Sequence, residues 1–214
     1  MTTRRKIFQY GGVIAGVLLI AFGFGALGMS IDARGTVSDE VQRENIVGSS
    51  DMNPADTEAA LAEAGLTGIA VPNCDVADQP IENGADARCF ARYLRIHALE
   101  SSGGLTYAEM GRFLAADDPE NLAGTSDAEA ALLDEEGNPV PNTARNTWVT
   151  ATALATALNV SYMAEQLALF GIVVGIALVL AGVGFIVLAL GGALRVPATG
   201  AATAGKPTAA VAAK

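Results

Sequence analysis

The side chains best suited to chemistry fall close together in the chain. His97 is the only histidine, and Tyr93 and Glu100 flank it closely. On a helix these spacings bring the three side chains to neighbouring positions, where a His–Glu pair beside a tyrosine can transfer protons. The alternative is a structural histidine in an apolar stripe with Phe90 and Leu94, held by a hydrogen bond to Glu100. We favour this alternative, because buried polar groups normally find partners without doing chemistry.

Arg88, Arg92 and Arg95 form a stripe on the opposite side of the same predicted helix. Guanidinium groups bind carboxylate and phosphate in a bidentate geometry, so the stripe could recognise an anion. The surrounding segment is rich in Asp and Glu. We therefore expect these arginines to face acidic groups of their own domain.

The two cysteines, Cys74 and Cys89, are predicted to form a disulfide, because both lie in a segment assigned below to the outside of the cytoplasm. The bridge would close a loop of about 16 residues, worth about 3 kcal/mol in the chain-entropy model. Two cysteines at this spacing and one histidine do not supply a four-ligand zinc site. No phosphate loop or dinucleotide fingerprint is present either, so we expect no metal and no cofactor.

Two apolar segments must anchor these residues. Residues 10–31 and 167–194 contain no charged side chain, and each exceeds the roughly 20 residues that cross a bilayer as a helix. We assign transmembrane helices to residues 9–31 and 167–194. A cleaved signal peptide is the alternative for the first segment, but its apolar run is longer than a signal core.

The charges divide at the same boundaries. All 23 acidic residues lie between Asp32 and Glu165, together with seven arginines and no lysine, so this segment carries a net charge of −16. Outside it every charge is basic and the net charge is +6. Basic residues favour the cytoplasmic ends of membrane helices. We therefore predict a multi-pass plasma-membrane protein with cytoplasmic tails at 1–8 and 195–214 and an extracytoplasmic domain at 32–166. The tail at 195–214 is low in complexity and is predicted to be disordered.

The segment between the spans shows repeated helix-start signals and no strong strand pattern. We expect short helices after Ser38, after Asn53 with Pro54 at the first helical position, and through the His97 stretch. Two capping boxes predict further helices, and they pair Thr106 with Glu109 and Ser126 with Glu129. The prediction is an all-α domain.

A long helix is expected to begin near Thr143 and to run on into the second span, because residues 143–170 contain neither proline nor glycine. Five side chains share one face of it at spacings of three and four, which predicts that this face packs against the shorter helices. They are Trp148, Ala151, Ala155, Leu158 and Tyr162.

Each predicted span also carries a stripe of glycines with matched spacing. Such stripes let helix backbones approach closely, so we expect the spans to make helix–helix contacts there. The positions are Gly12, Gly16 and Gly23 in the first span and Gly171, Gly175 and Gly182 in the second.

The stretches "RIHALESSGGLTYAEM" and "ARNTWVTATALATALNVSYMAEQLALFGIVVGIALVLAG" resemble an actinobacterial family of two-span membrane proteins of unknown function, often labelled aromatic ring-opening dioxygenase. The resemblance extends over nearly the whole chain and implies the same two-span topology. Ring-opening extradiol enzymes hold Fe(II) with two histidines and a carboxylate. This chain has only His97, so the residues do not support that activity.

Together these features predict an all-α membrane protein in which two transmembrane helices flank an extracytoplasmic helical domain, with the second span continuing a long helix. The favoured function is non-catalytic: interaction, assembly or sensing by the external domain. Alternatives are an oligomeric assembly with a transport or pore role and, third, an enzyme. Expected partners are membrane lipid and either another membrane or envelope protein or a second copy of the chain. The charge of −16 argues against nucleic acid.

Overall fold

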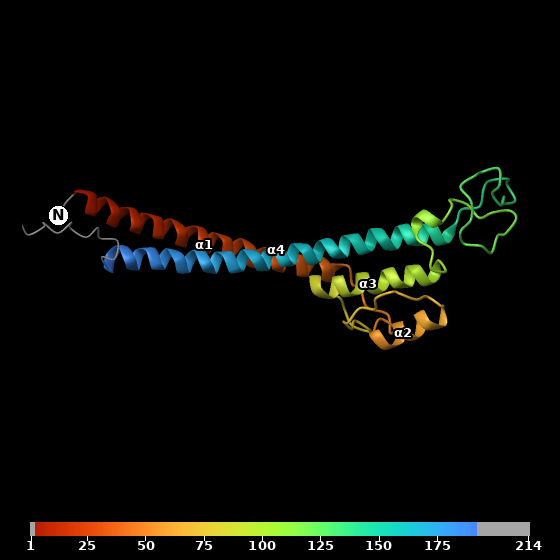
Figure 1. Cartoon of the computed structure of the whole chain (residues 1–214), viewed down its shortest axis with the longest axis horizontal. Coiled ribbons are helices and arrows are strands. Elements are labelled where there is room, and N and C mark those ends of the chain that lie inside the picture. Colours follow the sequence, from red (N-terminus) through yellow and green to blue (C-terminus); the bar gives the residue numbers. More distant parts are fainter. Residues whose placement is uncertain (1–2, 192–214) are drawn as a thin grey trace, which may run out of the picture. The chain divides into compact units, whose positions relative to one another are not determined.

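The computed structural model describes residues 3–191. These residues form helices joined by loops and contain no sheet. The helices are α1 (Thr3–Arg43), α2 (Pro54–Glu63), α3 (Gly84–Ser101) and α4 (Thr143–Gly191), with a 3-10 turn at Tyr107–Glu109 (Figure 1). Both α1 and α4 are long and apolar enough to cross a membrane. The predicted all-α class with two candidate spans is confirmed at this level. Residues 192–194 of the second predicted span and the tail at 195–214 lie outside the described residues.

The chain divides into two compact units. One consists of Met1–Ala26 with Val174–Lys214, and the other is Leu27–Val173. Because α1 begins at Thr3, most of the stretch predicted as an N-terminal tail is already helical.

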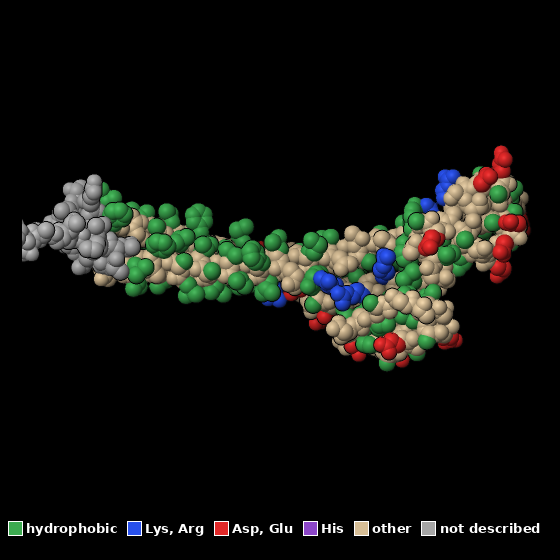
Figure 2. Space-filling model, in the orientation of Figure 1, with side chains coloured by type: hydrophobic (Ala, Val, Ile, Leu, Met, Phe, Trp, Pro, Cys, Tyr) green, Lys and Arg blue, Asp and Glu red, His purple; other side chains and the backbone are tan. Residues whose placement is uncertain are grey.

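In the first unit α1 and α4 run antiparallel and touch through their glycines (Figure 1). A Cβ atom built on Gly16 would lie 2.6 Å from the carbonyl oxygen of Gly182, and one on Gly23 would lie 2.8 Å from that of Gly175. Only glycine allows backbones to approach this closely. The large side chains point outward instead, and Phe22 is 71% exposed (Figure 2). Such an exterior matches lipid better than water.

The second unit is built around α3. Tyr93 is fully buried and lies in a cluster with Val41 of α1, Leu158 of α4 and loop residues such as Ile81. A second cluster joins the end of α3 to the start of α4, where Trp148 is buried. The predicted packing face of the long helix is thus the buried one.

Asparagine side chains start both short helices. The Asn53 side chain accepts a hydrogen bond from the backbone N–H of Asp56, and Pro54 occupies the first turn of α2, as predicted. Asn83 accepts bonds from the second and third N–H groups of α3. Each cap satisfies N–H groups that have no partner within the helix.

The separate helix expected after Ser38 is a wrong prediction, because α1 continues without a break to Arg43. The Ser38 hydroxyl donates to the carbonyl of Glu82, 2.8 Å away, and does not cap a helix. Val37 and Val41 pack on the core of the second unit, and this packing holds the extension in helical form.

The helices expected after Thr106 and Ser126 are also wrong. The capping box of Thr106 and Glu109 forms, with both bonds to the Glu109 carboxylate at 2.7 Å, but it starts only the 3-10 turn. Beyond it, residues 110–142 form an irregular loop held by isolated bridges, for example between Phe113 and Thr125. Backbone bonds between distant segments here override local helix propensity.

Candidate functional site

Apart from the glycine stripes, the candidate residues of the sequence analysis lie on helix α3. The one exception is Cys74, which lies in the loop before it. Its buried face includes Cys89, Phe90 and Tyr93, and its opposite face exposes Arg92 and Arg95. The structure therefore separates the tyrosine from the arginines, as the helical spacing predicts.

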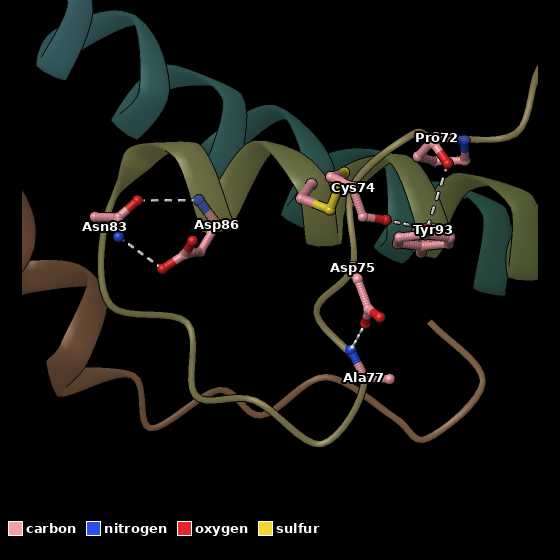
Figure 3. Close-up of a disulfide and its surroundings, with 8 residues drawn as sticks. Pro72, Cys74, Asp75, Ala77, Asn83, Asp86 and Tyr93 are labelled. Carbon is pink, nitrogen blue, oxygen red and sulfur yellow. Dashed lines mark hydrogen bonds between the residues drawn. A yellow bond between two sulfur atoms is a disulfide. The ribbon is translucent and has the colours of Figure 1, made fainter. Parts of the chain in front are cut away.

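The predicted disulfide between Cys74 and Cys89 is present and ties the loop before α3 to the helix itself (Figure 3). The two Cα atoms are 6.1 Å apart, within the usual range for a disulfide. The described residues contain no free cysteine.

Tyr93 uses its hydroxyl to hold the same loop. It donates a hydrogen bond to the carbonyl oxygen of Cys74, and the carbonyl of Pro72 lies 3.5 Å away (Figure 3). Burial, and after it the nearby Asp75 carboxylate, raises the pKa of Tyr93 above its ordinary value. A neutral, fully buried phenol bonded to backbone is a structural group, and its proton is not poised for transfer.

His97 pairs with a residue that the sequence analysis did not identify. Its Nε2 atom lies 3.3 Å from a carboxylate oxygen of Asp51, in the turn before α2. The expected partner, Glu100, makes no hydrogen bond to His97 among the described residues, and its Oε1 atom is buried without a partner there. The contact joins α3 to the α2 region. The carboxylate next to His97 is thus that of Asp51 and not the expected Glu100.

The arginine stripe does not pair with acidic groups of its own domain within residues 3–191. The guanidinium of Arg88 lies 4.3 Å from the ring centre of Tyr162, and that of Arg95 lies 5.1 Å from the ring of Trp148. Both contacts are cation–π interactions with α4. The described ion pairs of arginine involve Arg34 and Arg43 instead. The expected acidic partners are therefore not found in the described chain.

The exposed arginines border a groove of about 500 Å³ on one side of α3. Its lining includes Ile69, Val71, Pro72, Arg92, Arg95 and Leu99. On the other side of the same two arginines lies a smaller hollow of about 190 Å³ against α4. Both guanidinium groups are therefore accessible from an apolar cleft.

One wall of the groove is formed by residues 69–73 of an irregular loop. Within the part of the chain that the structure describes, residues 67–75 donate no hydrogen bond to backbone or side chain. Such an unpaired edge is a template for a second extended chain. The groove thus combines positive charge, an apolar surface and backbone donors.

The groove is positively charged, unlike most of the surface of this acidic unit. Figure 2 shows basic side chains beside α3, whereas acidic ones lie around the loop 110–142 and near α2. Since residues 32–166 have 23 acidic and seven basic side chains, a positive patch is the exception on this unit. At physiological salt the field decays over about 8 Å, so a ligand in the groove experiences mainly the local arginines.

The structure also shows a polar cluster around Glu165 that the sequence analysis did not predict. One carboxylate oxygen of Glu165 on α4 accepts a bond of 2.9 Å from Arg34 on α1, and the other accepts the backbone N–H of Gly84 at the start of α3. Glu165 therefore joins three helices, and its negative charge lies at a helix N-terminus, where it is stabilised. The available signal was a basic residue, Arg34, shortly after the first apolar segment and an acidic one, Glu165, shortly before the second.

The glycine positions divide between the units. Gly16 faces Gly182 and Gly23 faces Gly175, as described above, whereas Gly171 lies against the side chain of Ser30 in the second unit. Gly12 is half-buried on α1.

No group of three or more potential metal ligands occurs in the described residues. No family model, curated protein or solved structure matches this chain.

Proposed function

We propose that this protein is a non-catalytic, two-span plasma-membrane protein whose external unit binds an acidic, extended segment of a partner protein in the groove beside α3. The observation that carries the proposal is the pair Arg92 and Arg95. Both remain without a carboxylate within the described chain although the unit is strongly acidic. Exposed arginines are available to a ligand's carboxylates, which they bind in bidentate fashion.

The groove favours an extended peptide over a compact anion. Backbone N–H groups within residues 67–75 have no partner in the described chain and can donate to an extended peptide along this wall. Ile69, Val71 and Leu99 offer apolar contacts beside the arginines. Alternate side chains of an extended peptide point to opposite sides, so acidic and apolar residues in alternation would satisfy both surfaces.

The chemistry of the candidate catalytic residues also supports a binding role. His97 contacts Asp51, and Tyr93 is fully buried with its hydroxyl bonded to a backbone carbonyl. The two side chains therefore do not converge on one position in the groove where a substrate could react.

The test is binding of a fluorescent peptide to the full chain in detergent micelles. The probe is a capped peptide of about eight residues with alternating Glu and Val, and its control carries Gln in place of Glu. We expect the acidic peptide to bind, and Arg92→Gln with Arg95→Gln to weaken it about tenfold or more. Arg112→Gln is the matched control, because Arg112 contacts Phe113 and Ser126 away from the groove.

Equal binding of both peptides would overturn the proposal, and so would an equal loss of binding in the Arg112 variant. Higher salt should weaken the acidic peptide's binding, because the arginine contacts are exposed.

The orientation is proposed from the separation of charge, −16 between the apolar helices and +6 outside them. Single cysteines at Ser50 and Glu120 should react with a membrane-impermeant thiol reagent in intact cells, and one at Gly205 should not. The reverse pattern would contradict the orientation.

A further inference from the structure

Helix α4 has a second face that its own chain does not cover. Above the predicted span, exposed side chains recur at alternating spacings of four and three residues, and the pattern continues into the span. We call this set the α4 seam. It consists of Val149, Ala153, Thr156, Val160, Met163, Leu167 and Phe170.

The spacing is that of a coiled coil. Alternation of four and three gives a repeat of seven residues, which keeps one stripe facing a partner helix along the whole length of a pair. The exposure is high throughout: Val160 is 58% exposed and Met163 is 67% exposed. From Val149 to Phe170 the seam extends over about 32 Å at 1.5 Å per residue.

We propose that a second copy of this chain packs along the α4 seam, so that two α4 helices form a parallel pair outside and into the membrane. Identical chains insert into a bilayer in one orientation, so their α4 helices are parallel. A two-fold axis along the pair then places each seam residue opposite its own copy.

The lack of charge along this part of α4 favours a second copy of the chain as the partner that covers the seam. Residues 146–164 contain no charged side chain, although the surrounding segment carries −16. Two copies that met at the acidic faces of the unit would bring carboxylates together, which costs affinity. The α4 seam lets two strongly acidic units approach without this repulsion.

The neighbours of the seam fit the same arrangement. Coiled coils commonly place charged residues beside the seam to pair with the partner. Here the exposed flanking positions are neutral and include Thr152, Asn159 and Gln166. These side chains can donate and accept hydrogen bonds with their own copies, which identical charges cannot do.

Lipid explains only part of the seam. Leu167 and Phe170 fall within the predicted span, where lipid can cover them. Val149, Ala153 and Val160 precede that span, so their exposure needs another partner. Thr156 borders the small hollow beside Arg92 and Arg95, but no seam residue lines the groove on the other side of these arginines, so the contact does not depend on the proposed peptide binding.

The test is disulfide crosslinking in native membranes, for which the chain is well suited because both native cysteines are joined to each other. Ala153→Cys and Val160→Cys place a thiol on the seam. Leu154→Cys and Thr147→Cys are matched controls, exposed on the same helix but turned away from the seam. Mild oxidation should give a dimer band for the seam variants and little for the controls.

A second measurement uses charge. Val160→Asp places a carboxylate opposite its own copy and should lower the dimer fraction of the purified chain about tenfold or more. Thr147→Asp adds the same charge off the seam and should leave the dimer fraction unchanged. Retention of the Cys74–Cys89 disulfide and of the wild-type fluorescence of the buried Trp148 checks that the Val160→Asp unit is folded.

Crosslinking that is equal at seam and control positions would overturn the proposal, as would the absence of crosslinking at both seam positions. A dimer fraction that falls equally in the Val160→Asp and Thr147→Asp proteins would also overturn it.

Discussion

At Gly84 the start of α3 lies close against the backbone of α4, and replacement of this glycine by alanine tests that contact directly. A Cβ atom there would lie 2.8 Å from the Cα of Tyr162, 3.0 Å from the carbonyl oxygen of Ser161 and 2.7 Å from a carboxylate oxygen of Glu165. Two of these atoms belong to the backbone of α4 and cannot rotate away. The start of α3 must therefore move by a few tenths of an ångström, which also disturbs its bond to Glu165.

The magnitude follows from two opposing effects. Overpacking of a well-packed interior costs about 1–3 kcal/mol. Alanine in place of glycine within a helix recovers about 0.5–1 kcal/mol. We expect Gly84→Ala to lower the free energy of unfolding by about 1–2 kcal/mol, and the melting temperature by about 3–6 °C for a unit of this size.

The assay is thermal unfolding of the full chain in detergent, followed by the fluorescence of Trp148. This is the only tryptophan, and it is 6% exposed in the core of the second unit. Gly35→Ala is the control, because Gly35 is also helical but has nothing within 4 Å of its Cβ position. Its melting temperature should rise slightly. A Gly84→Ala protein that melts at or above the wild-type temperature would refute the reasoning.

Two further predictions concern the same unit. Replacing both Cys74 and Cys89 by serine should lower the free energy of unfolding by about 3 kcal/mol, measured by urea titration, and an unchanged midpoint would contradict the role given to the disulfide. Burial raises the pKa of Tyr93, so its contribution to stability is fully present below the ordinary pKa of 10.0 and is lost as the pH rises through the raised value. The melting temperature should fall more steeply above that pH in the wild type than in Tyr93→Phe, and identical alkaline profiles would refute the assignment.

The elements that were predicted correctly rest on strong local patterns. Long uncharged runs identified the two candidate spans, and the spacing of Trp148, Ala151 and Leu158 identified the buried face of α4. The pairing of Cys74 with Cys89 needed no geometry, because the chain has no other cysteine. In each case the information lies within a few helical turns or in the composition itself.

The wrong predictions concern residues whose structure is determined by contacts with segments far away in the sequence. Ser126 and Glu129 have the spacing of a capping box, but the loop 110–142 takes its hydrogen bonds from across the chain. The partner of His97 is Asp51, which lies far away in sequence, whereas Glu100 was the obvious local choice. Local patterns contain no information about such contacts.

The prediction that the arginine stripe faces acidic groups was wrong for a related reason. An abundance of carboxylates in the sequence suggested ion pairs, but the positions of Tyr162 and Trp148 on α4 gave Arg88 and Arg95 aromatic faces instead. Composition predicts average surroundings, whereas each side chain meets specific neighbours.

The order of synthesis gives the packing of α4 a further meaning. Tyr93 shares its cluster with Val41 near the beginning of the second unit and with Leu158 near its end. Because α4 is translated after α3, the part of the α3 surface that packs on α4 stays uncovered until residues 143–158 have been made. A nascent chain that stops before residue 143 lacks both Trp148 and Leu158, and its exposed core is a substrate for chaperones and proteases. We therefore expect the core of the second unit to close only when α4 has been completed.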